Sequence, residues 1–143
     1  LLHGRVGWFH LPLDIEAMHA GAALLAGEQD FSAFRAAECQ ARSPVKTLHR
    51  AEVLRQDDYI VFDFRASAFL HHMVRNMVGA LVYVGKGAHP PEWIAELIAG
   101  RDRRLAAPTF SPSGLYLSGV EYDACWQLPM NGRIIAPFDP VAI

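Results

Sequence analysis

The stretch from Phe69 to Gly79 places an arginine, two histidines and an amide at helical spacing. His71 and Arg75 are four residues apart, and His72 and Asn76 repeat that spacing on a neighbouring row. In an α-helix, with about 100° per residue, these side chains lie away from the apolar stripe of the same segment. One face of this helix would therefore pack, and the other would present the arginine, the two histidines and the amide.

The same pattern is also typical of an ordinary solvated helix face, and spacing alone favours that interpretation. Gly79 favours a functional face, because glycine inside a helix costs about 1 kcal/mol relative to alanine. Such a glycine usually admits the close approach of another group. A metal site is not expected: the adjacent histidines point about 100° apart, and neither HExxH nor a partner carboxylate accompanies them.

A second candidate is a basic segment that follows Asp30-Phe31-Ser32-Ala33-Phe34. Its cationic side chains are Arg35, Arg42, Lys46, His49 and Arg50, and Glu38 is the only acid among them. Contact with phosphate groups is the functional interpretation. An ordinary charged loop explains the segment equally well. A third basic spot, Arg101, Arg103 and Arg104, includes Asp102, and we expect it to be surface decoration.

The composition predicts a folded globular protein of one domain's size. The 143 residues are 52% hydrophobic and 20% charged, with a formal net charge of −2. This balance excludes a uniformly basic nucleic-acid coat but not a local basic patch. No apolar run approaches the roughly 20 residues of a membrane span, and residues 1–10 lack a signal-peptide pattern. Because the chain begins at Leu1 within a predicted strand, we expect a fragment of a longer protein.

The two cysteines, Cys39 and Cys125, form no CxxC pair. Neither a disulfide framework nor a structural zinc site is therefore expected, and a reducing cytoplasm fits best. Cys39 is predicted to be structural, because no histidine base is evident for it. The chain contains no GxSxG, GxxxxGK or GxGxxG motif, so nucleophile-elbow and nucleotide-loop chemistry are not indicated.

These side chains must be positioned by helices and strands that the sequence pattern predicts. A helix begins at the cap Asp14 and ends at Gly27. A second helix is predicted from the cap Ser67 to about Val84, and a short third one follows Pro90-Pro91. Strands are predicted over residues 2–10, 45–55, 59–66 and 114–122, with a hairpin turn at 56–58.

Without the inserted pieces, the element order is strand, helix, strand, strand, helix, strand. This order predicts an α+β, ferredoxin-like (split βαβ) fold, in which helices cover one face of an antiparallel sheet. Residues 1–123 would form this domain, and residues 124–143 an irregular tail along its surface. The other sheet face would remain available to a partner domain or to RNA.

The segment Phe69-Leu70-His71-His72-Met73-Val74-Arg75-Asn76-Met77-Val78-Gly79 resembles the F-x-H-H-M-V-R-N-x-V-G signature of the tRNA pseudouridine synthase A family. Further blocks match that family in order and spacing: Asp30 to Arg35, Cys39 to Pro44, Pro91 to Ile94, Arg101 to Arg103, Ala106 to Thr109 and Gly114 to Leu117. The resemblance extends from about His10 to Tyr122 and is highly specific.

The resemblance implies half of the pseudouridine synthase fold and a cofactor-free isomerase, which converts uridine to pseudouridine in the anticodon arm of tRNA. Arg75 would pair with the family's catalytic aspartate, and Leu115 would form part of the apolar wall of the base pocket. The remaining residues that the resemblance implicates are Arg35, Arg42 and Lys46 on the tRNA backbone, and His71, His72 and Asn76 as second-layer or RNA-facing groups. The family resemblance also implies a homodimer.

The chain departs from the family in lacking the G-R-T-D-x-G-V-H motif of the aspartate and the R-Y-x-Y motif of the base-stacking tyrosine. Both belong to the amino-terminal half, which is therefore an expected partner, and we expect this chain to be inactive by itself. Two alternatives remain open. One is a stand-alone RNA-binding module of the same topology, although residues 59–65 lack the RNA-recognition-motif pattern. The other is a ferredoxin-like oligomerisation or small-ligand domain.

Overall fold

The computed structural model describes residues 3–127 of the chain. The described residues divide into two compact units, one of residues 8–111 and one of residues 3–7 with 112–127, and each is described by itself. The elements of the larger unit are α1 (Ile15–Ala23), β1 (Gly27–Asp30), the 3-10 turn η1 (Ser32–Phe34), β2 (Val45–Gln56), β3 (Tyr59–Ala66), α2 (Met73–Gly85), α3 (Trp93–Gly100) and the 3-10 turn η2 (Arg103–Leu105).

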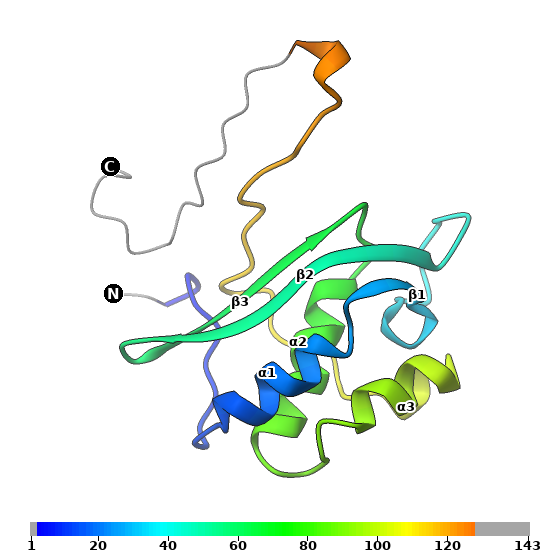
Figure 1. Cartoon of the computed structure of the whole chain (residues 1–143). Helices are drawn as coiled ribbons and strands as arrows, with labels where there is room; N and C mark the ends of the chain where they lie inside the picture. Colours follow the sequence, from blue (N-terminus) through cyan, green and yellow to red (C-terminus); the bar gives the residue numbers. More distant parts are fainter. Residues whose placement is uncertain (1–2, 128–143) are drawn as a thin grey trace. The chain divides into compact units, whose positions relative to one another are not determined.

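The larger unit is built on an antiparallel sheet of order β1-β2-β3. The three helices lie on the same side of this sheet (Figure 1). Between the layers, Leu48 and Val53 of β2 are buried together with Met18 of α1 and Met77 and Leu81 of α2. The predicted α+β class, an antiparallel sheet with helices on one face, is confirmed.

Strand β2 contains a bulge, which explains its irregular hydrophobic pattern. The pairing with β3 shifts between Leu48, which lies opposite Ala66, and Arg50, which lies opposite Arg65. His49 is therefore an extra residue of β2 with no paired residue on β3. Leu48 faces the core before the bulge, and Ala51 and Val53 face it afterwards. A bulge changes which parity of residue points inward, because alternation has a period of two. A 45–55 segment without clean alternation is therefore still a strand.

The β2–β3 hairpin agrees closely with the prediction. Strand β3 covers Tyr59–Ala66, and the connection is the two residues Asp57 and Asp58. Asp57 adopts a φ of 52°, a left-handed conformation that aspartate tolerates better than most side chains. The apolar side chains Ile60, Phe62 and Phe64 pack against the core from this strand.

Helix α1 begins as predicted, because the Asp14 carboxylate accepts a hydrogen bond from the Ala17 amide at 3.0 Å. It ends at Ala23, earlier than expected. The Gln29 amide group donates to the carbonyl oxygens of Leu24 and Ala26 (2.9 and 2.8 Å), which satisfies acceptors just beyond the helix end. Gly27, with a φ of 95°, then begins β1, a short strand that the sequence pattern did not reveal.

Three predicted features are wrong. Residues 3–10, the described part of the strand predicted over 2–10, form turns and bends, and residues 114–122 form no strand. Alternating side chains do not make a strand without a backbone partner, and neither stretch belongs to the three-stranded sheet. Ser67 does not cap α2. Its amide and hydroxyl bond to Thr47 at 2.9 and 3.2 Å, so it extends the sheet, and α2 begins only at Met73.

The smaller unit is described over residues 3–7 and 112–127. Within it, the Tyr116 hydroxyl donates to the Arg5 carbonyl oxygen at 2.6 Å, and Gly114, with a φ of 87°, lies close to Val6 and Gly7. Of the predicted irregular tail, residues 124–126 form a 3-10 turn, η3 (Ala124–Trp126), and residues 128–143 lie outside the described part. No helix of the described chain is long and apolar enough to cross a membrane.

Candidate active site

Arg75 lies in the first turn of α2, and its position is fixed by Phe110. Its Nε donates a hydrogen bond of 2.8 Å to the Phe110 carbonyl oxygen. In return, the Phe110 amide donates to the Arg75 carbonyl oxygen at 3.2 Å. The pair of bonds joins the helix backbone, the arginine side chain and the segment that follows η2, so the stem of the guanidinium is anchored from two sides.

The outer edge of the Arg75 guanidinium remains available. Over residues 3–127, its two terminal NH2 groups make no hydrogen bond and no carboxylate forms an ion pair with it. The side chain as a whole is half-buried. Its unbonded NH2 groups are accessible to solvent, since no buried side-chain nitrogen of the described residues lacks a partner. Planar donors held in a fixed fork are suited to bind a carboxylate or a phosphate through two hydrogen bonds.

Gly79 is buried on the same side of α2, one turn after Arg75. A Cβ at position 79 would overlap the backbone carbonyl oxygen of Pro108. The expected close approach of another group is therefore found, and that group is the main chain next to Thr109 and Phe110. The glycine lets this segment lie against the helix at the level where Phe110 reaches Arg75.

Asn76 is fully buried, and its amide is occupied by internal bonds. Its Nδ2 donates to the Phe34 carbonyl oxygen at 2.8 Å, and its Oδ1 accepts from the hydroxyl of Thr109 at 2.7 Å and from Arg103 at 3.0 Å. Asn76 was expected to be a second-layer or RNA-facing group; the buried position leaves no exposed amide for direct contact, and its role in the site stays a prediction. A sequence signal existed: Asn76 lies three residues after Met73 and four before Ala80, both of which are buried.

Arg103 is a functional candidate that sequence reasoning missed, and its assignment as surface decoration is wrong. Its guanidinium donates to the Ala107 carbonyl oxygen (2.9 Å), to Asn76 (3.0 Å) and to the Thr109 hydroxyl (3.0 Å). Partial burial lowers the pKa of Arg103. The neighbouring Arg101 and Arg104 are exposed and pair with Asp30 and Asp102, as surface residues do.

His71 and His72 precede α2 instead of continuing its rows. His72 adopts a left-handed conformation with a φ of 58°, and both imidazoles are exposed, with ring centroids 4.0 Å apart. Partial loss of hydration lowers the pKa of His72, and the charges of His71 and Arg75 lower it further. The helical-wheel argument therefore applies to Arg75 and Gly79 but not to the histidines, which nevertheless lie close to Arg75.

The turn of His71 is fastened to the loop that carries Arg35 and Cys39. The Ala36 amide donates to the His71 carbonyl oxygen (3.1 Å), and the His71 amide to the Cys39 sulfur (3.4 Å). Hydrogen bonds from the backbone amides of Ala41 and His71 lower the pKa of the Cys39 thiol. Cys39 thus has contacts that suit the structural role expected of it.

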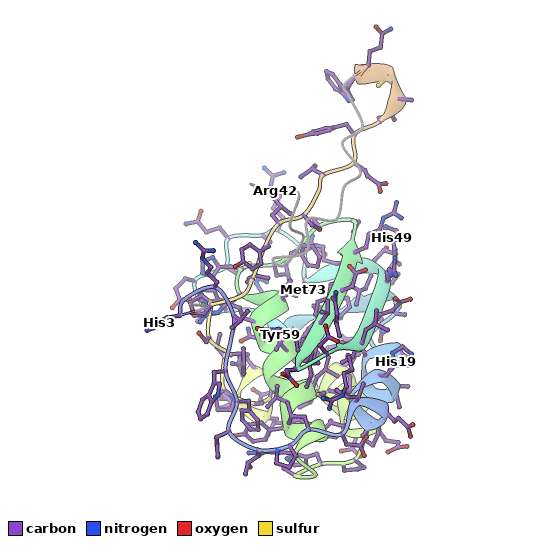
Figure 2. All side chains as sticks on the ribbon, turned by 90° about the vertical axis from the view of Figure 1, so that its left-hand side faces the viewer. His3, His19, Arg42, His49, Tyr59 and Met73 are labelled. Carbon is purple, nitrogen blue, oxygen red and sulfur yellow. The ribbon has the colours of Figure 1, made fainter. Side chains whose placement is uncertain are left out.

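The other residues predicted to contact RNA differ in whether their side chains are engaged in internal hydrogen bonds or exposed to solvent. Arg35 closes its own loop by donating to the carbonyl oxygens of Cys39 and Ala41, both at 2.8 Å. Arg42 is exposed and Lys46 is half-exposed. Figure 2 shows Arg42 at the surface of the molecule, as it does His49 at the bulge. Nothing in the structure tests their contact with RNA, which stays a prediction.

Leu115 belongs to the smaller unit, where 49% of its surface is exposed. Its predicted role in a base pocket remains a prediction. Within residues 3–127, no group of three or more histidine, cysteine, aspartate or glutamate side chains is arranged to hold a metal ion. The arginines held near the start of α2 can supply electrostatic stabilisation to an anion.

Comparisons with known proteins agree with this picture. A family model described as tRNA pseudouridine synthase matches residues 22–123. The chain is 67% identical to tRNA pseudouridine synthase A of Aromatoleum aromaticum over 135 residues, which are 94% of this chain and 51% of that protein. It is 64% identical to the protein of the same name from Methylobacillus flagellatus over 133 residues, 93% of this chain and 51% of the relative. The chain thus spans about half the length of the curated relatives it matches.

Proposed function

Because the chain belongs to the tRNA pseudouridine synthase family, we propose that it is the carboxy-terminal half of such an enzyme and supplies the supporting arginine, Arg75. The observation that carries this proposal is the state of that arginine. Its Nε is anchored on Phe110, and its terminal NH2 groups have no partner within residues 3–127. A guanidinium whose outer donors are accessible and unpaired can bind a carboxylate through two hydrogen bonds.

The missing anion is the catalytic aspartate, which the amino-terminal half contributes. In the reaction, the N1–C1′ bond of a uridine breaks, the uracil turns over, and a C5–C1′ bond forms. The C5 proton is lost and N1 gains one, so no cofactor is required. Arg75 keeps the aspartate ionised, since an opposite charge within about 4–6 Å lowers a carboxyl pKa. It also orients the carboxylate through the guanidinium fork.

The substrate is proposed to be the anticodon arm of tRNA, from which the target nucleotide is flipped out of its stack. Arg35, Arg42 and Lys46, with His71 and His72, contact the RNA backbone. Leu115 forms part of the apolar wall around the base. The complete enzyme works as a homodimer in the cytoplasm. Asn76 has no direct contact with RNA in this proposal, because its amide is buried and engaged.

The proposal is tested with a tRNA transcript tritiated at C5 of uridine, because isomerisation releases that tritium to water. The purified 143-residue chain is expected to release none. A full-length protein containing this chain is expected to release tritium, and to lose that activity when its amino-terminal aspartate is changed to asparagine. Tritium release by the chain alone would contradict the assignment of roles. An inactive full-length protein that is folded and binds tRNA would overturn the proposed activity.

A further inference from the structure

We propose that Arg103 is a positioning residue for Arg75, which acts through Asn76, Thr109 and the Phe110 carbonyl group. The consequence for turnover rests on the proposed function, whereas the positioning itself does not. The inference concerns a cluster of side chains that meet on one side of α2, and no catalytic contact is assigned to Arg103.

The cluster begins with the three acceptors that Arg103 binds. One NH2 group donates to the Ala107 carbonyl oxygen at 2.9 Å. The other donates to Asn76 Oδ1 and to Thr109 Oγ1, both at 3.0 Å. The Thr109 hydroxyl donates a hydrogen bond to Asn76 Oδ1 at 2.7 Å. The guanidinium therefore joins both ends of the segment 107–109 to a buried amide on α2.

Each end of this network is one residue from the Arg75–Phe110 pair. Asn76 follows Arg75 on the helix, and its Nδ2 is tied to the Phe34 carbonyl oxygen, so it cannot turn freely. Thr109 precedes Phe110, so the position of Thr109 fixes where the Phe110 carbonyl group points. The Gly79 contact with Pro108 sets the distance of the same segment from the helix.

The geometry matters because Arg75 has a single anchored donor. With Nε bonded to Phe110, rotation of the guanidinium is restricted and the two NH2 groups are left as its free donors. A carboxylate can then be bound through two parallel hydrogen bonds, an arrangement that depends on the fixed fork. If the carbonyl group of Phe110 moves, the cation stays in the region but loses this orientation.

The positioning itself is tested by NMR on the 143-residue chain, through hydrogen exchange of the Arg75 Nε–H. In Arg103→Met, this proton is expected to exchange about tenfold faster or more, because its acceptor is no longer held in place. Arg104→Met is the matched control, since Arg104 binds only Asp102 in the described residues, and no change is expected. Thr109→Val, which removes a single hydroxyl, serves if Arg103→Met does not fold. Unchanged exchange in a folded variant would overturn the positioning.

The consequence for catalysis is tested in a full-length protein containing this chain. Arg103→Met is expected to lower kcat by about tenfold with KM for tRNA unchanged, since it acts on orientation. The acidic limb of the pH–rate profile should move to higher pH, because a displaced Arg75 depresses the pKa of the carboxylate less. Partial recovery is expected in Arg103→Lys. An active protein whose folded Arg103→Met variant keeps both kcat and profile would overturn this role, whereas an inactive parent protein would overturn only the proposed function.

Discussion

Two groups of arginines within residues 8–111 are held in different ways. Those of the first group pair with carboxylates and are largely exposed: Arg50 with Glu52 and Asp63, Arg101 with Asp30, and Arg104 with Asp102. Those of the second group are half-buried and donate to uncharged oxygens: Arg35, Arg75 and Arg103. The first group lies along the sheet and around α3, and the second surrounds the start of α2.

The two groups differ in whether the positive charge of the arginine is neutralised. A carboxylate cancels the charge of its arginine, whereas a carbonyl oxygen satisfies a donor and leaves the charge in place. The start of α2 also carries the positive end of the helix dipole. In a chain with a net charge of −2, the start of α2 thus gathers three arginines that form no ion pair with a carboxylate of the described residues. An anionic partner is expected at the start of α2. The exposed ion pairs elsewhere do not indicate where such a partner would bind.

The largest expected effect is that of Arg75→Ala on turnover in a full-length protein. We expect a loss of about 10²–10³-fold, of the size seen when one preorganised electrostatic donor is removed. The tRNA dissociation constant should change little, because phosphate contacts supply most of the affinity. Single-turnover kinetics with saturating enzyme measure the loss of turnover, and filter binding measures the tRNA dissociation constant. Unchanged turnover would remove Arg75 from the site and end the distinction between the two groups.

The next effect is on stability. Asn76→Leu should lower the free energy of unfolding by about 2–4 kcal/mol, because it leaves the Phe34 carbonyl group and donors of Arg103 and Thr109 without a buried partner. Urea denaturation of the chain measures it. Gln56→Leu, at an exposed amide at the end of β2, is the control and should leave the midpoint nearly unchanged. Equal effects at the two positions would mean that the buried network does not stabilise the fold.

A smaller effect is expected on RNA affinity. Arg42→Ala should weaken tRNA binding about equally for all sequences and reduce the slope of log Kd against log salt by about one, as expected for a lost phosphate contact. Arg104→Ala is the control, because Asp102 already cancels its charge. A salt slope that changes at Arg104 and not at Arg42 would contradict the expectation that an arginine paired with a carboxylate contributes less to RNA binding than one without such a pair.

The smallest effect concerns a pKa. In Arg75→Met, the pKa of His72 should rise, because a neighbouring positive charge that opposes protonation is gone. The pKa should remain below the ordinary value, since partial desolvation of the ring, the largest cause, persists. The same substitution therefore extends the pH range in which His72 is charged. An NMR titration of the His72 ring measures the shift. A fall in its pKa would show that Arg75 does not act on this imidazole.

Local patterns predicted the elements that local chemistry determines. Asp14 was predicted as a cap and is one, and the alternation from Tyr59 to Ala66 gave strand β3 with its turn at Asp57. Ser67 was misassigned, because a serine after a strand can cap a helix or extend the sheet, and only the partner, Thr47, decides. The strands over residues 2–10 and 114–122 were wrong for the same reason: pairing is not local.

The candidate site was predicted in part. Arg75 and Gly79 stand out by spacing and by the cost of a helical glycine, and both lie where something approaches α2. Arg103 and Arg104 are neighbours in an Arg-Asp-Arg-Arg run, and no pattern separates them. The difference arises from the 3-10 turn η2, which directs one guanidinium to Asn76 and leaves the other at the surface. Such a distinction depends on the position of distant backbone.

The bulge in β2 has a consequence for changes in chain length. Removing His49 would leave Leu48 and Ala51 separated by one residue, so the two halves of the strand would merge into one continuous alternation with Leu48, Ala51 and Val53 on the same side. Removing Leu54 or Arg55 instead would shift the residues on one side of the deletion by one position, so that their inward and outward alternation would no longer match that of β3. Tolerance to a one-residue deletion in this strand is therefore expected to be concentrated at the bulge.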